Sequence, residues 1–321
     1  MEPSIKAVER AEAANPRVLV LMATFNGTPW IRDQVLSIVA QRDVAVTLAV
    51  CDDDSLDGTL SQVRAAAGDS LRVESIKSTR LGGSAARNFF RLIEAVDPVG
   101  HELVALADQD DLWEPGKLAR AAGRLHASDA VGYSAPVRAF WPDGRTAVLS
   151  QRPTPTLADY VFEGAGQGCT FVMRAGYFAE MQAVLARHRE ALSSLHYHDW
   201  TLYALSRSMG YRWLFDDWVC MQYRQHAEND TGARSGMDAI KRRIVLIRSG
   251  WYGAQTRAIA RLCVSASGGT ATGAVRYLWL VDAPRNWHKR AALCAFVLRH
   301  GRRRWLDRVV LAWAALSGHL T

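Results

Sequence analysis

Short apolar runs that stop abruptly at polar turns recur along the first third of the chain. The unbroken run from Arg17 to Ala23 predicts a central strand of a parallel sheet, because strands buried on both faces read as continuous hydrophobic stretches. Apolar positions at helical spacing follow over residues 30–41. The alternation then repeats, with further strands expected over Val44–Cys51, Leu71–Ile76 and Leu103–Ala107. This β-α-β-α-β-α-β order predicts a parallel sheet with right-handed crossovers.

The pattern changes after about residue 118. The expected elements are a helix over Lys117–Ala127, strands over Ala130–Trp141 and Thr170–Arg174, a helix from His198 to about Met209, and a strand-like segment over Tyr211–Tyr223. From Gly236 onward the sequence predicts mostly helix. The expected fold class is therefore α/β, with a Rossmann-like, mostly parallel sheet flanked by helices and a basic helical C-terminal extension. The expected domains are a lead (1–16), a body (17–235, with halves 17–116 and 117–235) and the extension (236–321).

Polar and acidic side chains follow three of the predicted strands. The carboxyl ends of parallel strands meet at one edge of a sheet, so these residues are expected to converge where open α/β sheets bind ligands. Asp108 and Asp110 are two residues apart, and in extended backbone both side chains point the same way. Two carboxylates facing one way suit Mg²⁺ or Mn²⁺ carrying a diphosphate. The acidic turn is expected to lead into a helix, with Asp111 as N-cap, Glu114 three residues later and Pro115 in the first turn. The alternative to a metal site is that this run is only a solvated, helix-capping turn.

Glycine-rich phosphate-binding motifs do not follow the first strand. Neither GxGxxG nor GxxxxGK[ST] occurs there, which argues against a dinucleotide-binding Rossmann site and against a P-loop. A nucleotide bound at this edge of the sheet would be held by carboxylates and a metal ion.

Charge is distributed unevenly along the 321 residues. Residues 233–321 carry 16 basic and 3 acidic side chains, a net +13, whereas residues 1–232 carry 23 and 29, a net −6. The basic runs at Lys241–Arg248 and Arg302–Arg304 alternate with apolar stretches that contain several tryptophans. This composition is typical of an amphipathic anchor on an anionic membrane surface. The alternative is a helical cap or an oligomer contact with a solvated basic side.

Five scattered cysteines without a CxxC motif indicate reduced thiols, and the acidic, polar N-terminus does not read as a secretory signal. We therefore expect a cytoplasmic protein, peripheral on the cytoplasmic face of the inner membrane if the basic tail binds lipid. No apolar run approaches the ~18 residues of a spanning helix.

Four motifs in order resemble family 2 glycosyltransferases. They are MATFNG at residues 22–27, DQVLSIVAQ at 33–41, CDDDSLDGT at 51–59 and ADQDDLW at 107–113. The DQDD-x-W form is similar to the bacterial rhamnosyltransferase-like branch, and HDW at 198–200 and YRQH at 223–226 extend the match over about residues 17–231. The resemblance implies a GT-A fold, a nucleotide-sugar donor, a divalent metal (Mn²⁺ or Mg²⁺) and inversion at the anomeric carbon.

The resemblance also assigns roles to residues. The donor nucleotide is expected at Thr24, Asn26, Asp52, Asp53 and Asp108. Asp52 or Asp53 would accept a hydrogen bond from the imide N–H of uracil or thymine, since a carboxylate is a pure acceptor. Asp54 departs from the glycine usual in the family. The metal ligands are expected to be Asp110, Asp108 and His226.

Asp199 is expected to be the catalytic base, and the acceptor or sugar pocket is expected to include Trp113, Gly168, His198 and Trp200. Plain structural readings exist for each: Asp199 as a helix N-cap, His226 as a structural histidine and the tryptophans as core. The donor suggested by the branch is dTDP-L-rhamnose, with a UDP-hexose or UDP-N-acetylhexosamine as the alternative. The acceptor is expected to be a glycan or glycolipid, a lipid-linked precursor of a cell-surface glycan. A nucleotidyltransferase or a nucleic-acid-binding protein is a remote alternative, and no nucleic-acid partner is expected because the acidic body would repel phosphate.

Overall fold

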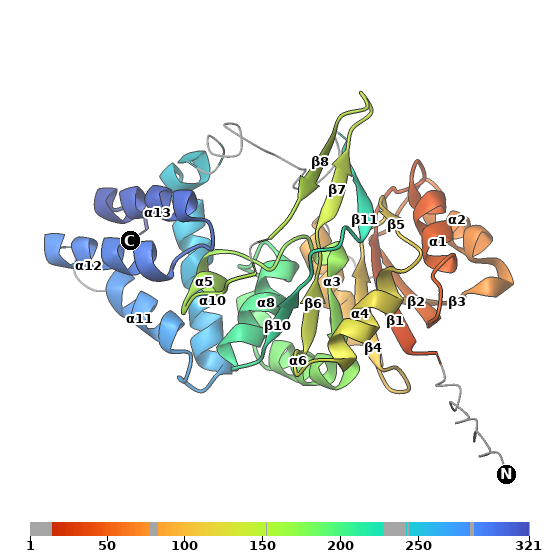
Figure 1. Cartoon of the computed structure of the whole chain (residues 1–321), viewed down its shortest axis with the longest axis horizontal. Helices are drawn as coiled ribbons and strands as arrows, with labels where there is room; N and C mark the ends of the chain where they lie inside the picture. The colour runs from red at the N-terminus through yellow and green to blue at the C-terminus, as the bar shows by residue number, and fades with distance from the viewer. Residues whose placement is uncertain are drawn as a thin grey trace, which may run out of the picture.

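The predicted alternation of strands and helices is present in the first third of the chain (Figure 1). The strands run parallel in the order β3-β2-β1-β4. Their bounds are β1 Arg17–Thr24, β2 Ala45–Asp52, β3 Arg72–Ile76 and β4 Leu103–Ala107, and the helices between them are α1 Ile31–Val39, α2 Thr59–Ala67 and α3 Ala85–Ala95. A short 3-10 turn, η1 (Gly68–Ser70), precedes β3. This computed structural model describes residues 15–76, 83–151, 153–226, 242, 244–282 and 286–320.

The central sheet has seven strands, in the order β10-β6-β9-β4-β1-β2-β3. The added strands are β6 Gly132–Ser134, β9 Val172–Arg174 and β10 Trp213–Phe215. Strand β9 runs antiparallel to both β4 and β6, so the sheet is mixed and mostly parallel. The expected α/β class is confirmed.

The strand order reverses at β1. Strand β2 lies on one side of β1 and β4 on the other, with Met22 opposite Ala107. Crossovers then leave in opposite directions from neighbouring strands, which opens a crevice beyond their carboxyl ends. The polar residues that follow β1 and β4 therefore lie side by side at this crevice, as the sequence predicted.

A second sheet has four strands in the order β5-β11-β7-β8, and its strand β5 directly follows the acidic turn. Its strands are β5 Leu112–Trp113, β7 Val137–Phe140, β8 Thr146–Leu149 and β11 Met221–Arg224. Antiparallel pairing of β5 with β11 sets Leu112 opposite Gln222 and Trp113 opposite Met221. The end of β11 is thereby held beside the acidic turn that precedes β5. Figure 1 shows β7 and β8 projecting as a hairpin from the edge of the fold.

Alternate residues of the central strands face two separate hydrophobic clusters. In β1, Leu19 and Leu21 face the cluster formed with α3, α6 and α8, whereas Val18 and Val20 face the one formed with α1, α2 and α4. Helices α4 Lys117–His126, α6 Ala175–Arg187 and α8 His198–Ser208, together with the short α5 Asp159–Phe162 and α7 Arg189–Leu192, complete the two layers.

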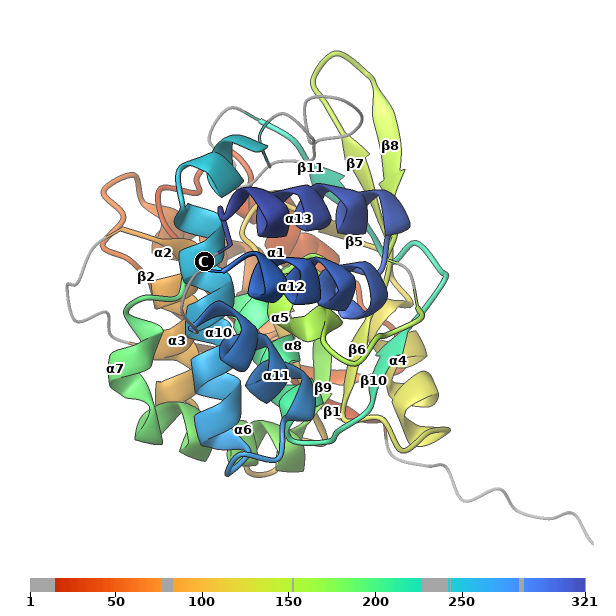
Figure 2. The same cartoon turned by 90° about the vertical axis from the view of Figure 1, so that its left-hand side faces the viewer.

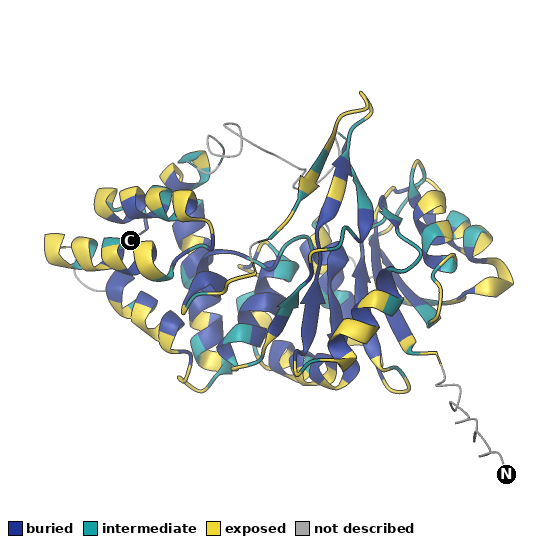
Figure 3. Cartoon of the chain, in the orientation of Figure 1, coloured by how far each residue is buried: buried dark blue, intermediate teal, exposed yellow. Residues whose placement is uncertain are grey.

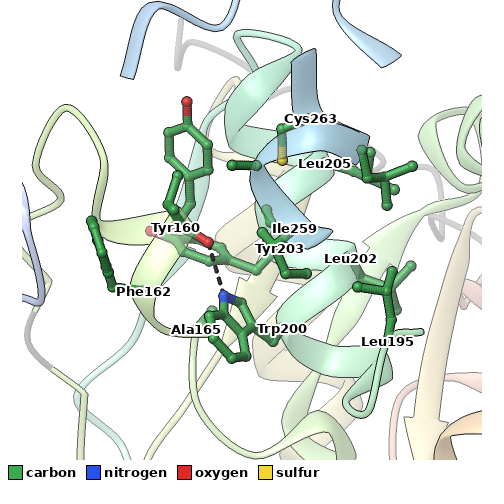
Figure 4. Packing of buried hydrophobic residues seen from close by; sticks show 14 of the residues in the cluster. Tyr160, Phe162, Ala165, Leu195, Trp200, Leu202, Tyr203, Leu205, Ile259 and Cys263 are labelled. Atoms are coloured by element: carbon green, nitrogen blue, oxygen red, sulfur yellow. Dashed lines mark hydrogen bonds between the residues drawn. The ribbon is translucent and has the colours of Figure 1, made fainter. Parts of the chain in front are cut away.

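The C-terminal helices extend the cluster on the α8 side. They are α10 Trp251–Ala266, α11 Thr272–Val281, α12 Trp287–His300 and α13 Trp305–Ser317. Figure 4 shows Ile259 and Cys263 of α10 packed near Leu202 and Leu205 of α8. The expected helical extension therefore shares its core with the body of the protein, and the two are packed side by side (Figures 1 and 2). Residues 1–14 of the expected lead, Gly236 and Lys241 lie outside the described residues.

Three details of the sequence prediction are wrong. Asp111 does not cap α4, which begins at Lys117 after Gly116 and has no side-chain cap, because residues 112–113 instead form β5. The expected strand over Ala130–Trp141 is two strands, β6 and β7, in different sheets. The segment over Tyr211–Tyr223 likewise divides into β10 and β11.

Candidate active site

A cavity of about 1610 Å³ opens at the crevice beyond β1 and β4 and reaches the start of α13. It brings together most of the residues that the sequence singled out. Those that line it are Thr24, Asn26, Asp108, Asp110, Gly168, His198, Asp199, Trp200 and His226. Asp52, Asp53 and Trp113 are not among the residues that line it. One cavity therefore joins the acidic strand ends to the start of α8 and to the basic C-terminal helices.

The turn after β1 is held by the carboxylate of Asp52. Asp52 Oδ1 accepts hydrogen bonds from Thr24 Oγ1 and Ser55 Oγ, both at 2.6 Å, and Oδ2 accepts from the Ser55 backbone N–H at 2.8 Å. Asn26 is tied to the same loop, since its backbone N–H donates to Ser55 Oγ at 2.7 Å and its Oδ1 accepts from Leu56 N at 3.1 Å. Asp52 thus shapes the loop at which the nucleotide is expected.

Asp53 faces a different set of partners. Its Oδ1 is 2.7 Å from Arg91 Nη1 of α3, and its Oδ2 accepts from the Gly83 backbone N–H at 3.2 Å. The sequence did not predict the partnership with Arg91. Asp54, the residue that departs from the family's usual glycine, has a φ of 59°. The left-handed conformation that favours glycine is therefore retained, and an aspartate tolerates it better than most side chains.

Two carboxylates and a histidine meet at the end of β4. Asp110 Oδ2 lies 2.7 Å from His226 Nε2, and the imidazole stacks on Trp30, with ring centroids 3.8 Å apart at 17°. Burial raises the pKa of Asp108 to about 7, and the charges of Asp110 and Asp199 act in the same direction. Two neighbouring carboxylates repel each other when both are ionised, and a bound cation stabilises their ionised forms. These donors therefore fit a hard divalent metal.

A positive charge lies behind this cluster. Lys117 is fully buried, its Nζ donates to the carbonyl of Cys169 at 2.6 Å, and it lies 3.1 Å from the centroid of the Trp113 ring. Burial lowers the pKa of Lys117 to about 8 and raises that of Asp111 well above its usual value. The charge of Lys117 favours the ionised forms of both Asp111 and Asp108.

A second possible ligand set lies deeper than the cavity. The ligand atoms of Asp108, Asp111 and Cys169 are within 4.8 Å of one another. Asp111 and Cys169 are fully buried, burial raises the pKa of the thiol, and Lys117 already supplies a cation there. The pair Asp110 and His226 faces the cavity and needs no thiolate, so it is the better candidate for the metal.

Asp199 lies in the first turn of α8 and faces the same cavity. Its neighbour His198 stacks on Phe89, with centroids 4.0 Å apart at 23°. Burial lowers the pKa of His198 to about 3, so its imidazole is neutral at physiological pH. Its Nε2 has no hydrogen-bond partner among the described residues. Gly168 packs directly against this pair, because a Cβ there would lie 2.7 Å from His198 Nε2 and 3.1 Å from Asp199 Cβ.

The two tryptophans expected in a sugar pocket lie in the core to different degrees. Trp113 is 4% exposed beneath Lys117 and away from the cavity, a position that favours a packing role. Trp200 is 6% exposed and borders the cavity, while its Nε1 donates to the carbonyl of Tyr160 at 2.9 Å (Figure 4). Little of Trp200 is therefore available to a ligand.

The far wall of the cavity comes from the basic C-terminal segment. Arg303 is almost fully buried and lies 2.8 Å from Asp159 Oδ2 and 3.5 Å from Glu163 Oε1. Arg302 pairs with Glu163 at 3.2 Å and with Asp307 at 3.0 Å. These contacts join α5 to the α12–α13 connection across more than a hundred residues of sequence. Part of the basic charge is therefore neutralised internally and fixes the C-terminal helices to the body.

Sequence comparison identifies the family. The model of the family described as "Glycosyltransferase like family 2" matches residues 16–208. The dTDP-rhamnosyl transferase RfbG of Shigella flexneri is 34% identical over 242 residues, which is 74% of this chain and 83% of RfbG. The chain belongs to glycosyltransferase family 2. The succinoglycan biosynthesis protein ExoU of Rhizobium meliloti is a more distant relative, 27% identical over 63% of this chain and 60% of its own.

Solved structures show the same fold. Residues 1–349 of TarS from S. aureus superpose with a TM-score of 0.56 at 14% identity, covering 95% of this chain and 89% of that one. The mannosyltransferase PcManGT of Pyrobaculum calidifontis, solved with GDP-Man and Mn²⁺, gives a TM-score of 0.52 at 20% identity over 95% and 87%. At such low sequence identities, the structural similarity establishes the GT-A fold and no more. Together with the family, it makes this protein a glycosyltransferase that uses a nucleotide-sugar.

Several site residues of the glycosyltransferase escaped the sequence analysis. Trp30 and Arg91 are ordinary helix-region residues by pattern, and only the fold brings them to His226 and Asp53. Lys117 appeared only as the first residue of the helix expected over Lys117–Ala127, and nothing in the local pattern indicated that it would be buried. Arg303 was visible only as part of a basic run.

Proposed function

We propose that the protein is an inverting, metal-dependent transferase that moves a sugar from a nucleotide-sugar to a hydroxyl of a glycan acceptor. One observation carries the proposal: Asp199 faces the same cavity as Asp108 and Asp110, close enough for its charge to raise the pKa of Asp108. A carboxylate base and a diphosphate-binding cluster across one cavity are what a single displacement needs.

The proposed donor is dTDP-L-rhamnose, and similarity to the dTDP-rhamnosyl transferase RfbG supports it. Thr24 and Asn26 line the cavity, and Asp53 lies next to Thr24, since its backbone N–H donates to the Thr24 carbonyl at 2.9 Å. These three residues would hold the nucleoside, with Asp52 shaping their loop through Thr24 and Ser55. A UDP-hexose or UDP-N-acetylhexosamine is the alternative donor, and the TarS structure with UDP-GlcNAc shows that this fold accommodates one.

Asp110, Asp108 and His226 would hold the divalent metal, Mn²⁺ or Mg²⁺. When bound, it neutralises the negative charge that builds on the departing diphosphate. The stack on Trp30 fixes the ring of His226, and the buried ammonium of Lys117 offsets carboxylate charge from behind. The complex of PcManGT with GDP-Man and Mn²⁺ supports this reading.

The chain's own residues would carry the transfer step as follows. The carboxylate of Asp199 accepts the proton of the acceptor hydroxyl while that oxygen forms a bond to the anomeric carbon. The bond from that carbon to the diphosphate oxygen breaks on the opposite face, so the configuration inverts. Neutral His198 beside the base does not compete for this proton, because burial holds its pKa far below that of a free imidazole.

The proposed acceptor is a lipid-linked precursor of a cell-surface glycan, used at the cytoplasmic face of the membrane. Support comes from the relatives named for rhamnosyl transfer and succinoglycan biosynthesis and from the basic C-terminal helices that reach the cavity. No helix within the described ranges is long and apolar enough to cross a membrane, so the proposed association is peripheral.

The decisive experiment is calorimetric titration of dTDP, UDP, GDP and ADP, each with and without Mn²⁺. We expect metal-dependent binding with dTDP above UDP; a preference for UDP would change the donor and keep the mechanism. Asp110→Asn should lower Mn²⁺-dependent nucleotide affinity at least about tenfold. Asp199→Asn should reduce turnover by about 10²–10⁴-fold with nucleotide affinity unchanged. Turnover retained in Asp199→Asn would remove this residue as the base.

A further inference from the structure

Helix α13 carries an apolar stripe on the side that does not face the protein core. Trp305, Leu306, Val309, Trp313 and Leu316 are between 39% and 67% exposed. At ~100° per residue these five positions fall within about 100° of the helix circumference, and they span about 16 Å along the axis. We call them the α13 stripe. A second apolar face, at Leu311, Ala314 and Ala315, is buried.

The α13 stripe lies on the outside of the molecule. Figure 2 shows α13 and α12 as the layer nearest the viewer, on the side of the C-terminal helices that is remote from the sheet. Figure 3 shows exposed residues along the outer sides of both helices. A helix that is apolar on two opposite faces packs one against its own chain and leaves the other for an external partner.

The charge around the stripe is positive. Residues 286–320 contain seven lysines and arginines and a single acidic residue, Asp307, which is buried and paired with Arg302. Arg299 and Arg304, by contrast, are exposed. A second copy of the chain docked symmetrically on this surface would bring like charges together. An anionic lipid surface complements them, and tryptophans beside basic residues are typical of helices that lie in the membrane interface.

The stripe is continuous with the active-site cavity. Arg304, Trp305 and Leu306 belong to the cavity lining that also contains Asp108 and Asp199. A surface that bound the stripe would therefore lie at the rim of the cavity. An acceptor tethered to that surface would reach Asp199 while its anchor stays in the surface.

We propose that the α13 stripe, with Arg299 and Arg304 beside it, docks the protein on an anionic lipid bilayer and holds the cavity open toward the acceptors anchored there. The docking itself depends only on the C-terminal helices, while its purpose rests on the proposed function.

The test is flotation of the full chain with vesicles of phosphatidylcholine and phosphatidylglycerol, compared with pure phosphatidylcholine. The wild type should bind the anionic vesicles more tightly. Val309→Glu places a negative charge in the stripe and should weaken this binding at least about tenfold. The matched control is Val99→Glu, an exposed valine in the loop before β4, which should bind as the wild type does. Arg299→Glu should also weaken binding, whereas the exposed Arg42→Glu should have a smaller effect.

Three results would overturn the proposal. They are equal binding to both vesicle types, undiminished binding by Val309→Glu, or a concentration-dependent dimer that Val309→Glu dissociates while vesicles are not bound. Nucleotide titration without vesicles separates this proposal from the proposed function, since Val309→Glu should bind dTDP with Mn²⁺ as the wild type does. Vesicle binding without nucleotide binding would leave the docking surface intact and refute the function.

Discussion

Replacing Gly168 by alanine tests whether the base is held in place by packing. Gly168 begins a 3-10 turn, η2 (Gly168–Thr170), whose backbone at this residue lies outside the left-handed region, so alanine meets no conformational barrier there. The obstacle is steric. The new Cβ would lie 2.7 Å from His198 Nε2 and 3.1 Å from Asp199 Cβ. His198 is buried against Phe89 and has little room to retreat.

The size of the effect follows from that overlap. A carbon–nitrogen contact needs about 3.5 Å, so the ring and the adjoining Asp199 must shift by a large part of 1 Å. Overpacking of a buried site costs about 1–3 kcal/mol in unfolding free energy. A displacement of this size at a catalytic group lowers the rate by up to ~10²-fold, which is about 2.7 kcal/mol in the barrier. We therefore expect kcat to fall about 10- to 100-fold.

The assay is steady-state sugar transfer combined with nucleotide titration and urea unfolding. Because the new Cβ would meet His198 and Asp199 rather than the turn held by Asp52, dTDP affinity with Mn²⁺ should change less than about twofold. Gly176→Ala in α6 is the matched control: a Cβ there meets nothing within 4 Å, and removing a helical glycine should slightly stabilise the protein. Unchanged kcat in Gly168→Ala, with the protein folded, would refute the claim that this packing positions the base.

Three further outcomes are expected. Arg303→Met should lower the unfolding free energy by about 1–3 kcal/mol, because it removes one of the partners of the buried carboxylates Asp159 and Glu163 and leaves the others, Arg207 and Arg302, in place. Exposed Arg304→Met should change it by less than ~0.5 kcal/mol. Urea denaturation measures both, and equal values would contradict the argument. The affinity for Mn²⁺ should rise from about pH 5.5 to about pH 7.5, because protonated Asp108 competes with the metal below its raised pKa; a pH-independent calorimetric affinity would oppose this. Trp30→Ala should weaken Mn²⁺ about tenfold through loss of the stack on His226, and an unchanged titration would assign that stack to packing alone.

The strands that position the donor end of the cavity were predictable because they are buried on both faces. Continuous apolar runs mark β1, β2 and β4, and each ends at polar residues, of which those at the ends of β1 and β4 line the cavity. The second sheet was not predictable, since β5 has only two residues and its pairing with β11 lies about a hundred residues away in sequence. The division after β10 has a local cause. Asp216 turns inward to bind Arg120 and the hydroxyl of Tyr133, and the chain leaves the central sheet there.

The residues of the site also fall into a group that the sequence indicated and a group that only the fold revealed. Spacing and motif order indicated Asp108, Asp110 and Asp199, because these residues sit at strand ends or helix starts that a sequence reveals. The groups that set their environment come from distant segments, and nothing in the local pattern identifies a partner. The role of Lys117 is the clearest example, since its contact with the Cys169 carbonyl spans 52 residues.

The acidic body and the basic C-terminal segment of the chain have different structural roles. At the donor end, Asp108 and Asp110 lie close together in front of the buried Lys117, and a bound metal ion would favour the ionised forms of both carboxylates. At the other end, Arg302 and Arg303 are matched by buried carboxylates, whereas Arg299 and Arg304 are exposed. The carboxylates at the donor end are thus suited to bind the metal ion that we propose accompanies the donor. The basic excess fixes the C-terminal helices and leaves a cationic rim on the side from which we propose the acceptor enters.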